Sequence, residues 1–111
     1  MTITLSGYQF EGPAIITMWK TTHGEGVYSI LRGKTDGRYI SHNVIYFGES
    51  GNLLEREVLD KHPKYQCWLK WAGSKSNTYI SVYPMLDSNE EDRKKIVEEL
   101  IKVYNPVCNQ N

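Results

Sequence analysis

Two tyrosines and an arginine are spaced so that they could act together on a phosphate. Tyr28 lies in one β-rich run, and Tyr46 lies near the end of a second such run, just before Gly48. Arg56 follows Asn52, a residue type that favours a helix N-cap, by about one helical turn. Two phenols and a guanidinium on one concave face suit phosphodiester chemistry, because they can orient water and stabilise charge on the phosphate. A phenol titrates near pH 10, so a tyrosine base would need a metal or another cation nearby.

A basic, aromatic segment follows the arginine. Four lysines and no acid occur between residues 61 and 86, and the lysines are interleaved with aromatic residues. The lysines are Lys61, Lys64, Lys70 and Lys75, and the aromatic residues are Tyr65, Trp68, Trp71 and Tyr79. Ammonium groups bind phosphates and aromatic rings stack on bases, so these lysines are candidate nucleic-acid-binding residues. In the alternative interpretation, the aromatic residues belong to the core and the lysines are only solvated.

The periodicity of the chain predicts the elements that would position these groups. Strands are predicted at residues 27–31, at 39–40 with 44–47, and at 78–85. Helices are predicted at residues 53–59, at 65–72, and from a Ser88 capping box to about Tyr104, before Pro106. These elements predict an α+β fold in which a small antiparallel sheet of about three strands is flanked by helices.

The chain length suits one domain. Residues 24–111 are expected to form it, and residues 1–23 are expected to be an N-terminal extension or an extra strand that packs on the core. The formal net charge is zero, and the longest apolar run, Ala14 to Trp19, is far shorter than a membrane span of roughly 20 residues. No secretory signal is visible, so we expect a cytoplasmic protein without membrane contact. Cys67 and Cys108 form no Cys-x-x-Cys motif, and we expect two reduced thiols rather than a disulfide or a metal site.

Taken together, the motifs resemble the GIY-YIG nuclease superfamily, which includes excision-repair nuclease subunits, intron homing endonucleases and some restriction enzymes. The matching residues are Gly26-Val27-Tyr28, Tyr46-Phe47-Gly48, Asn52-Leu53, Arg56 and the C-terminal stretch from Leu100 to Asn109, which ends in Pro-x-x-Asn. The resemblance covers residues 24 to 109, which is most of the chain.

The resemblance implies a role for each matching residue. Tyr28 would be the general base or nucleophile activator, and Tyr46 would help to position the attacking water. Arg56 would stabilise the phosphate, and His62 resembles a histidine that often follows the same helix. Three further residues would have structural roles: Gly26, Gly48 and Asn109.

The resemblance also implies a divalent metal, Mg²⁺ or Mn²⁺, in an active protein. Members of the superfamily bind it through a glutamate on the last helix, four residues before the isoleucine of the Leu-Ile pair and twelve before the final asparagine. Counting back from Ile101 and from Asn109 leads both times to Val97. Either the helix is rolled or offset so that the adjacent Glu98 binds the metal, or the usual ligand is lost. Phenols alone would hold a hard cation weakly.

Three classes of function are compatible with these observations. The leading hypothesis is a GIY-YIG-like, metal-dependent DNA endonuclease, or a degenerate descendant of one. Its DNA would be branched, damaged or non-specific, and it would act as a homodimer or with a partner protein. The second is a non-catalytic nucleic-acid-binding module of the same fold. The third is a protein-interaction module, which the zero net charge favours.

Overall fold

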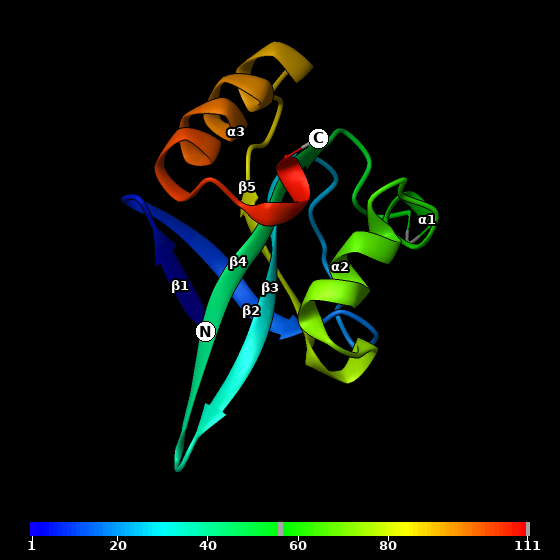
Figure 1. Cartoon of the computed structure of the whole chain (residues 1–111). Helices are drawn as coiled ribbons and strands as arrows, with labels where there is room; N and C mark the ends of the chain where they lie inside the picture. Colours follow the sequence, from blue (N-terminus) through cyan, green and yellow to red (C-terminus); the bar gives the residue numbers. More distant parts are fainter. Residues whose placement is uncertain (56, 111) are drawn as a thin grey trace.

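Among the residues that the structure describes, five strands form one antiparallel sheet (Figure 1). The computed structural model describes residues 1–55 and 57–110. The strands are β1 (Thr2–Leu5), β2 (Tyr8–Ile15), β3 (Gly26–Asp36), β4 (Tyr39–Ser50) and β5 (Thr78–Pro84). The helices are α1 (Glu57–Asp60), α2 (Tyr65–Ala72) and α3 (Glu90–Tyr104), with short 3-10 turns η1 (Lys75–Asn77) and η2 (Val107–Asn109). The order β1-β2-β5-β3-β4 places β3 between β5 and β4.

The predicted sheet of about three strands is wrong. The five strands form a curled half-barrel, and more of the described residues lie in strands than in α-helices. The two additional strands, β1 and β2, pair with each other and extend the sheet from β5. The sequence left residues 1–23 open between an N-terminal extension and an extra strand, because Gly7, Gly12 and Pro13 are typical of loops. Ser6 and Gly7, both with positive φ, form the two-residue hairpin loop, whereas Gly12 and Pro13 lie at a register shift within β2.

Helices cover both faces of the sheet, because each strand turns alternate side chains to opposite sides. α2 lies against the face that carries Tyr28, and its Trp68 side chain is fully buried there. α3 lies against the opposite face, where Leu100 joins Val27 and Phe47 in a second apolar cluster. The two tyrosines predicted for the site therefore belong to the face that α2 covers.

Two of the predicted helices are confirmed. α2 spans the predicted residues, and α3 ends at Tyr104 as expected. The N-cap of α3 is Asn89 rather than Ser88, because the Asn89 side chain accepts a hydrogen bond from the amide of Asp92 at 2.8 Å. None of the described helices is long and apolar enough to cross a lipid bilayer.

The helix predicted at residues 53–59 is shorter in the structure, where α1 covers only Glu57–Asp60. The amide of Leu53 donates a hydrogen bond to the carbonyl of Gly24 at 2.7 Å, and the Leu53 side chain is buried. This bond to a distant segment holds the backbone after Asn52 outside the helix. Arg56 lies outside the described residues, so its predicted role is not placed in the fold.

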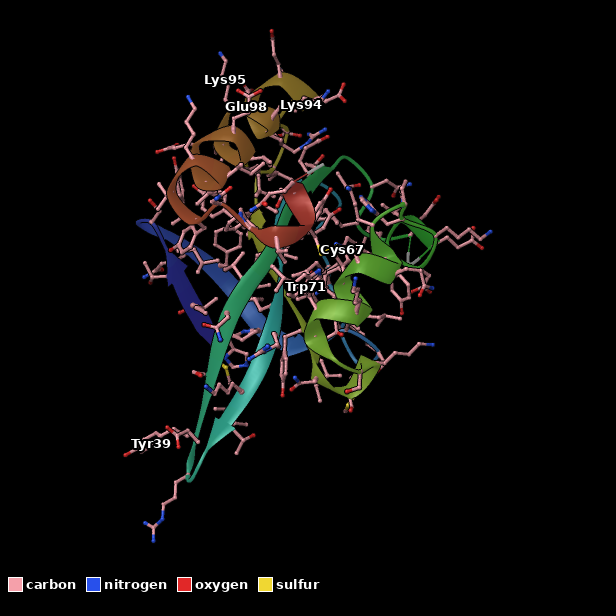
Figure 2. The ribbon with its side chains drawn as sticks, viewed as in Figure 1. Tyr39, Cys67, Trp71, Lys94, Lys95 and Glu98 are labelled. Carbon is pink, nitrogen blue, oxygen red and sulfur yellow. A yellow bond between two sulfur atoms is a disulfide. The ribbon has the colours of Figure 1, made fainter. Side chains whose placement is uncertain are left out.

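Cys67 and Cys108 form a disulfide, and the expectation of two reduced thiols is wrong. The bond joins α2 to η2, two elements that both contact β4. No local spacing motif predicts this pair, because the cysteines are separated by 41 residues and come together only in the folded chain. Cys67 is labelled on α2 in Figure 2.

Reduction of the disulfide is expected to lower the free energy of unfolding by about 4 kcal/mol, because the open chain regains the entropy of a loop of this length. Urea denaturation followed by circular dichroism, with and without a dithiol reductant, measures the change. The Cys67→Ser/Cys108→Ser variant is the control, and its midpoint should not respond to the reductant. Titration of two free thiols in unreduced, unfolded protein would contradict the pairing.

Candidate functional site

Tyr28, Tyr46 and His62 contact one another and are called the tyrosine–histidine cluster. Tyr28 pairs with Gly48 across the β3–β4 ladder, which puts both tyrosines on one face of the sheet. Their ring centroids are 6.1 Å apart. His62 follows α1, and its Nε2 lies 3.4 Å from the Tyr46 hydroxyl oxygen. Trp68 of α2 packs against all three rings.

Gly48 and Gly26 have steric reasons to lack a side chain. A Cβ at Gly48 would lie 2.5 Å from the Tyr28 hydroxyl oxygen and 2.8 Å from the Tyr46 ring. A Cβ at Gly26 would lie 2.5 Å from the carbonyl oxygen of Tyr83 on β5. The first glycine admits the Tyr28 side chain, and the second lets β3 approach β5.

Asn109 fixes β4 beside the cluster. Its side-chain oxygen accepts a hydrogen bond from the amide of Phe47 at 2.8 Å, and its side-chain nitrogen donates to the Phe47 carbonyl at 2.9 Å. The asparagine thus binds the edge strand as a neighbouring strand would, at the residue directly after Tyr46. The asparagine of the C-terminal Pro-x-x-Asn motif therefore has a structural role, which is to hold the backbone of β4 in place.

The hydrogen bond between His62 and Tyr46 has a defined direction. His62 Nδ1 accepts a hydrogen bond from the amide of Lys64 at 3.0 Å, so the neutral ring carries its hydrogen on Nε2. That Nε2–H group donates to the Tyr46 oxygen. Among the described residues, none accepts the hydrogen of the half-buried Tyr46 hydroxyl. This hydrogen is therefore available to a bound anion.

Burial sets the protonation of the cluster. Burial raises the pKa of Tyr28 and Tyr46 above the ordinary value of a phenol, and the charge of Glu49 acts in the same direction. The hydrogen bond from Tyr28 offsets part of this effect on the pKa of Tyr46. Burial, helped by the charge of Lys64, lowers the pKa of His62. Near neutral pH both phenols are therefore protonated and the imidazole is neutral, so the cluster offers hydrogen-bond donors more readily than a base.

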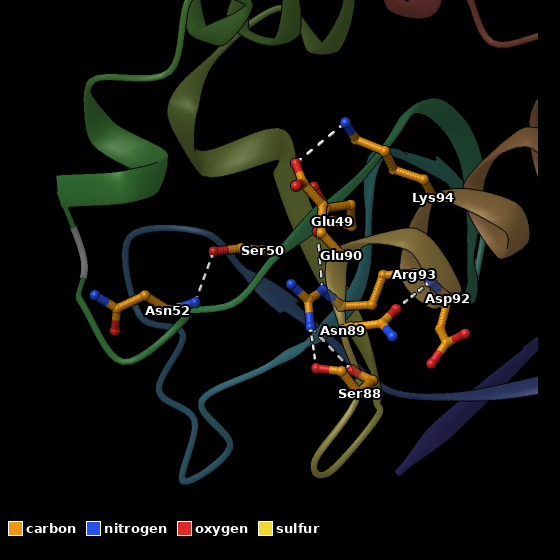
Figure 3. Close-up of polar contacts among 9 residues, drawn as sticks. All are labelled: Glu49, Ser50, Asn52, Ser88, Asn89, Glu90, Asp92, Arg93 and Lys94. Atoms are coloured by element: carbon orange, nitrogen blue, oxygen red, sulfur yellow. Dashed lines mark hydrogen bonds and ion pairs between the residues drawn. The ribbon is translucent and has the colours of Figure 1, made fainter.

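Glu49 and Arg93 form a buried ion pair between β4 and α3 (Figure 3). Arg93 belongs to α3 and is 6% exposed, and its Nε donates to the Glu49 carboxylate at 2.8 Å. Its Nη1 donates to both the carbonyl and the hydroxyl oxygen of Ser88. Glu49 directly follows Gly48, so the guanidinium engages the carboxylate whose charge acts on both tyrosines.

Sequence reasoning missed Arg93, although the helical spacing contained a signal. Arg93 precedes Val97 by four residues, and residues four apart lie on the same helix face. A charged residue on the inward, apolar face of a helix requires a buried partner. Glu49 is that partner, and its position became visible only when α3 was placed beside β4.

The carboxylates of α3 do not reach the tyrosine–histidine cluster. Val97 packs with Leu100 on the sheet face opposite to Tyr28. Glu98 is exposed and lies between Lys94 and Lys95 on the outer side of α3 (Figure 2). Within residues 1–55 and 57–110, no group of three or more His, Cys, Asp or Glu side chains is placed to hold a metal ion.

Lys64 and Lys70 lie along the exposed side of α2 and the turn before it. Lys64 is half-buried beside His62, and its charge acts on the imidazole. Lys70 is exposed, and its Nζ lies 5.9 Å from the ring centroid of Trp71. Neither contacts a described carboxylate in an ion pair, so their charges are available to an anion.

Lys61 and Lys75 have acidic neighbours. The Nζ of Lys61 lies 3.4 Å from the Glu57 carboxylate, in an exposed pair one helical turn apart. Lys75 lies in η1 and lines an open depression together with Asp60 and Tyr65. Of the four lysines predicted to bind nucleic acid, these two therefore contribute less net positive charge to the surface.

Removal of the Arg93 side chain is expected to destabilise the protein by about 3–5 kcal/mol, because Arg93→Ala leaves Glu49 buried without its partner. Urea denaturation measures the loss, and Arg93→Met with Glu49→Gln should recover most of it. Lys94→Ala is the matched control, because Lys94 makes only an exposed pair with Glu90 and should unfold with nearly the wild-type midpoint. Equal midpoints for Arg93→Ala and Lys94→Ala would refute the buried pair.

Comparisons with known proteins identify no relative. None of the protein-family models, curated proteins or solved structures matches this chain. The resemblance to the GIY-YIG superfamily accordingly stays a prediction, carried by the motif residues themselves.

Proposed function

We propose that the protein binds nucleic acid and holds a backbone phosphate at the tyrosine–histidine cluster, as a degenerate relative of the GIY-YIG nucleases. The hydrogen-bonding state of Tyr46 carries this proposal. Its oxygen accepts a hydrogen bond from His62, and its own hydrogen remains available to an anion. A donor held in place by a neighbouring side chain is suited to a phosphate oxygen.

The charge around α2 supports the same ligand. Lys64 stands beside His62, and Lys70 lies one to two turns further along the helix. The sequence of α2 contains no acid. A nucleic-acid strand that contacts the cluster would therefore lie near the ammonium groups of Lys64 and Lys70, and no carboxylate of this helix would repel it. Local positive charge of this kind attracts a polyanion even on a protein of zero net charge.

Replacement of Lys64 and Lys70 by alanine is expected to weaken DNA binding and to reduce the salt slope of the affinity by about 2, one for each lost phosphate contact. Fluorescence anisotropy with a labelled oligonucleotide over a series of salt concentrations measures both effects. Lys95→Ala/Lys102→Ala is the control, because it removes the same charge from exposed positions on α3. Flat binding curves for every nucleic acid, with a protein partner recovered instead, would favour a protein-interaction module.

Metal-dependent phosphodiester cleavage is the second candidate, and the contact between Tyr46 and His62 favours it. The described oxygen ligands do not fit Mg²⁺ or Mn²⁺ well. Arg93 engages the Glu49 carboxylate, and Glu98 lies on the outer side of α3. Only the phenol oxygens of Tyr28 and Tyr46 are then left as ligands among the described residues of the cluster. A hard cation takes about six oxygen ligands, so this set is too small. Binding without cleavage is therefore the better supported function.

We expect plasmid, nicked and branched DNA to stay intact with Mg²⁺ or Mn²⁺, and we expect the affinity for DNA to be the same in EDTA. Gel electrophoresis after prolonged incubation tests the first expectation, and anisotropy tests the second. Cleavage that disappears in Tyr46→Phe, but persists in the Lys95→Ala/Lys102→Ala control, would establish the endonuclease instead. The Tyr46→Phe change removes only the hydroxyl group, so the ring packing of the cluster is kept.

The compartment and the assembly remain proposals. The cytoplasm is the location expected from the sequence, whereas a disulfide such as Cys67–Cys108 is typical of oxidising compartments. Alkylation of thiols in intact cells distinguishes the two, because only the reduced protein reacts. A homodimer or a partner protein stays part of the proposal, and light scattering of the purified protein tests the dimer.

A further inference from the structure

Trp71 is a large exposed aromatic side chain on an otherwise well-packed helix. It is 46% exposed, whereas Trp68, one turn earlier on α2, is fully buried. Its ring lies under the ammonium group of Lys70, with 5.9 Å between Nζ and the ring centroid. Figure 2 labels it on α2, close to Cys67. An indole that is held by a rigid helix and partly open to solvent presents a flat face to a ligand.

The helical spacing connects Trp71 to the phosphate site. Lys64, Trp68 and Trp71 are separated by four and then three residues, so they follow one stripe along the α2 side of the molecule. Trp68 contacts the cluster through Tyr46 and His62. Trp71 therefore stands about 5 Å further along the helix axis than the tryptophan that touches the cluster.

Basic residues continue the stripe onto the sheet. Side chains of β3 alternate between the two faces, so Arg32 and Lys34 share the face of Tyr28, which is the one that α2 covers. α2 and η1 both contact β3. Arg32 and Lys34 therefore add positive charge to the sheet face on which α2 lies, and Asp36, two residues further along β3, adds one negative charge to it.

We propose that Trp71 stacks on an unpaired base, and that the ligand of this surface is single-stranded DNA whose phosphates lie against Lys64 and Lys70. The inference rests on the proposed nucleic-acid binding and specifies its ligand. In a duplex the bases are stacked on one another, so their faces are not accessible. Only a single strand has an accessible base face on which the indole can stack. Stacking on an aromatic side chain is a main source of affinity in single-strand binding, and the neighbouring lysines supply the salt-dependent part.

The experiment compares a labelled single strand with its own duplex by fluorescence anisotropy. We expect the single strand to bind at least about tenfold tighter, and Trp71→Ala to weaken its binding by about tenfold or more with little effect on the duplex. Trp71→Phe keeps an aromatic ring that can stack on a base, so this variant should retain most of the affinity for the single strand. Tyr39→Ala is the matched control, because Tyr39 is a 79% exposed aromatic residue at the tip of the β3–β4 hairpin, remote from α2 (Figure 2).

A second readout separates stacking from loss of fold. Saturating single strand should quench the tryptophan fluorescence of the wild type, and Trp71→Phe should remove most of the quenching while its unfolding midpoint stays unchanged. Unaltered single-strand affinity in Trp71→Ala, with weakened binding in Lys64→Ala/Lys70→Ala, would overturn this inference alone. Tighter binding of duplex DNA, or of RNA of the same sequence, would overturn the ligand. Absence of binding to any nucleic acid would overturn the proposed function as well.

Discussion

The close approach of Tyr28 to Gly48 is the constraint on which the candidate site depends. Gly48 opposes Tyr28 in the β3–β4 ladder, and any Cβ there would collide with the phenol. Because β3 is paired on both sides, it cannot move away to make room for such an atom. The missing side chain allows Tyr28 to reach Tyr46, and Asn109 holds β4 in place from the other edge. The donor that is proposed to meet a phosphate is therefore positioned by backbone geometry more than by flexible side chains.

The electrostatics beside this contact favour binding over catalysis. Burial keeps the phenols of Tyr28 and Tyr46 protonated at neutral pH, and a base would have to become an anion in the same enclosed space. Glu49 would oppose that charge further, while its own charge is compensated by Arg93. The guanidinium thus stabilises a carboxylate and leaves the phenols neutral. A site of this kind can donate hydrogen bonds to a phosphate without activating water.

Several features were predictable because short-range patterns define them. The alternation of the strands explains why Tyr28 and Tyr46 share a face, whereas their grouping with His62 was implied by the resemblance to the GIY-YIG superfamily. The apolar spacing of α2 and the start and stop signals of α3 were equally local. Residues 1–23 left two alternatives open, because the glycines and Pro13 that indicate loops elsewhere lie at a hairpin turn and a register shift of the sheet.

By itself, the sequence determined the extent of α2, the end of α3, and the excess of lysine around α2. Each of these depends on neighbours within a few positions of the chain, where periodicity and turn chemistry act. The tertiary structure alone decided the five-stranded half-barrel, the Cys67–Cys108 disulfide and the Glu49–Arg93 pair. It also placed Glu98 on the outer side of α3, between Lys94 and Lys95. The physical reason is that such contacts join residues tens of positions apart, and only the packing of the sheet between its helices brings them within bonding distance.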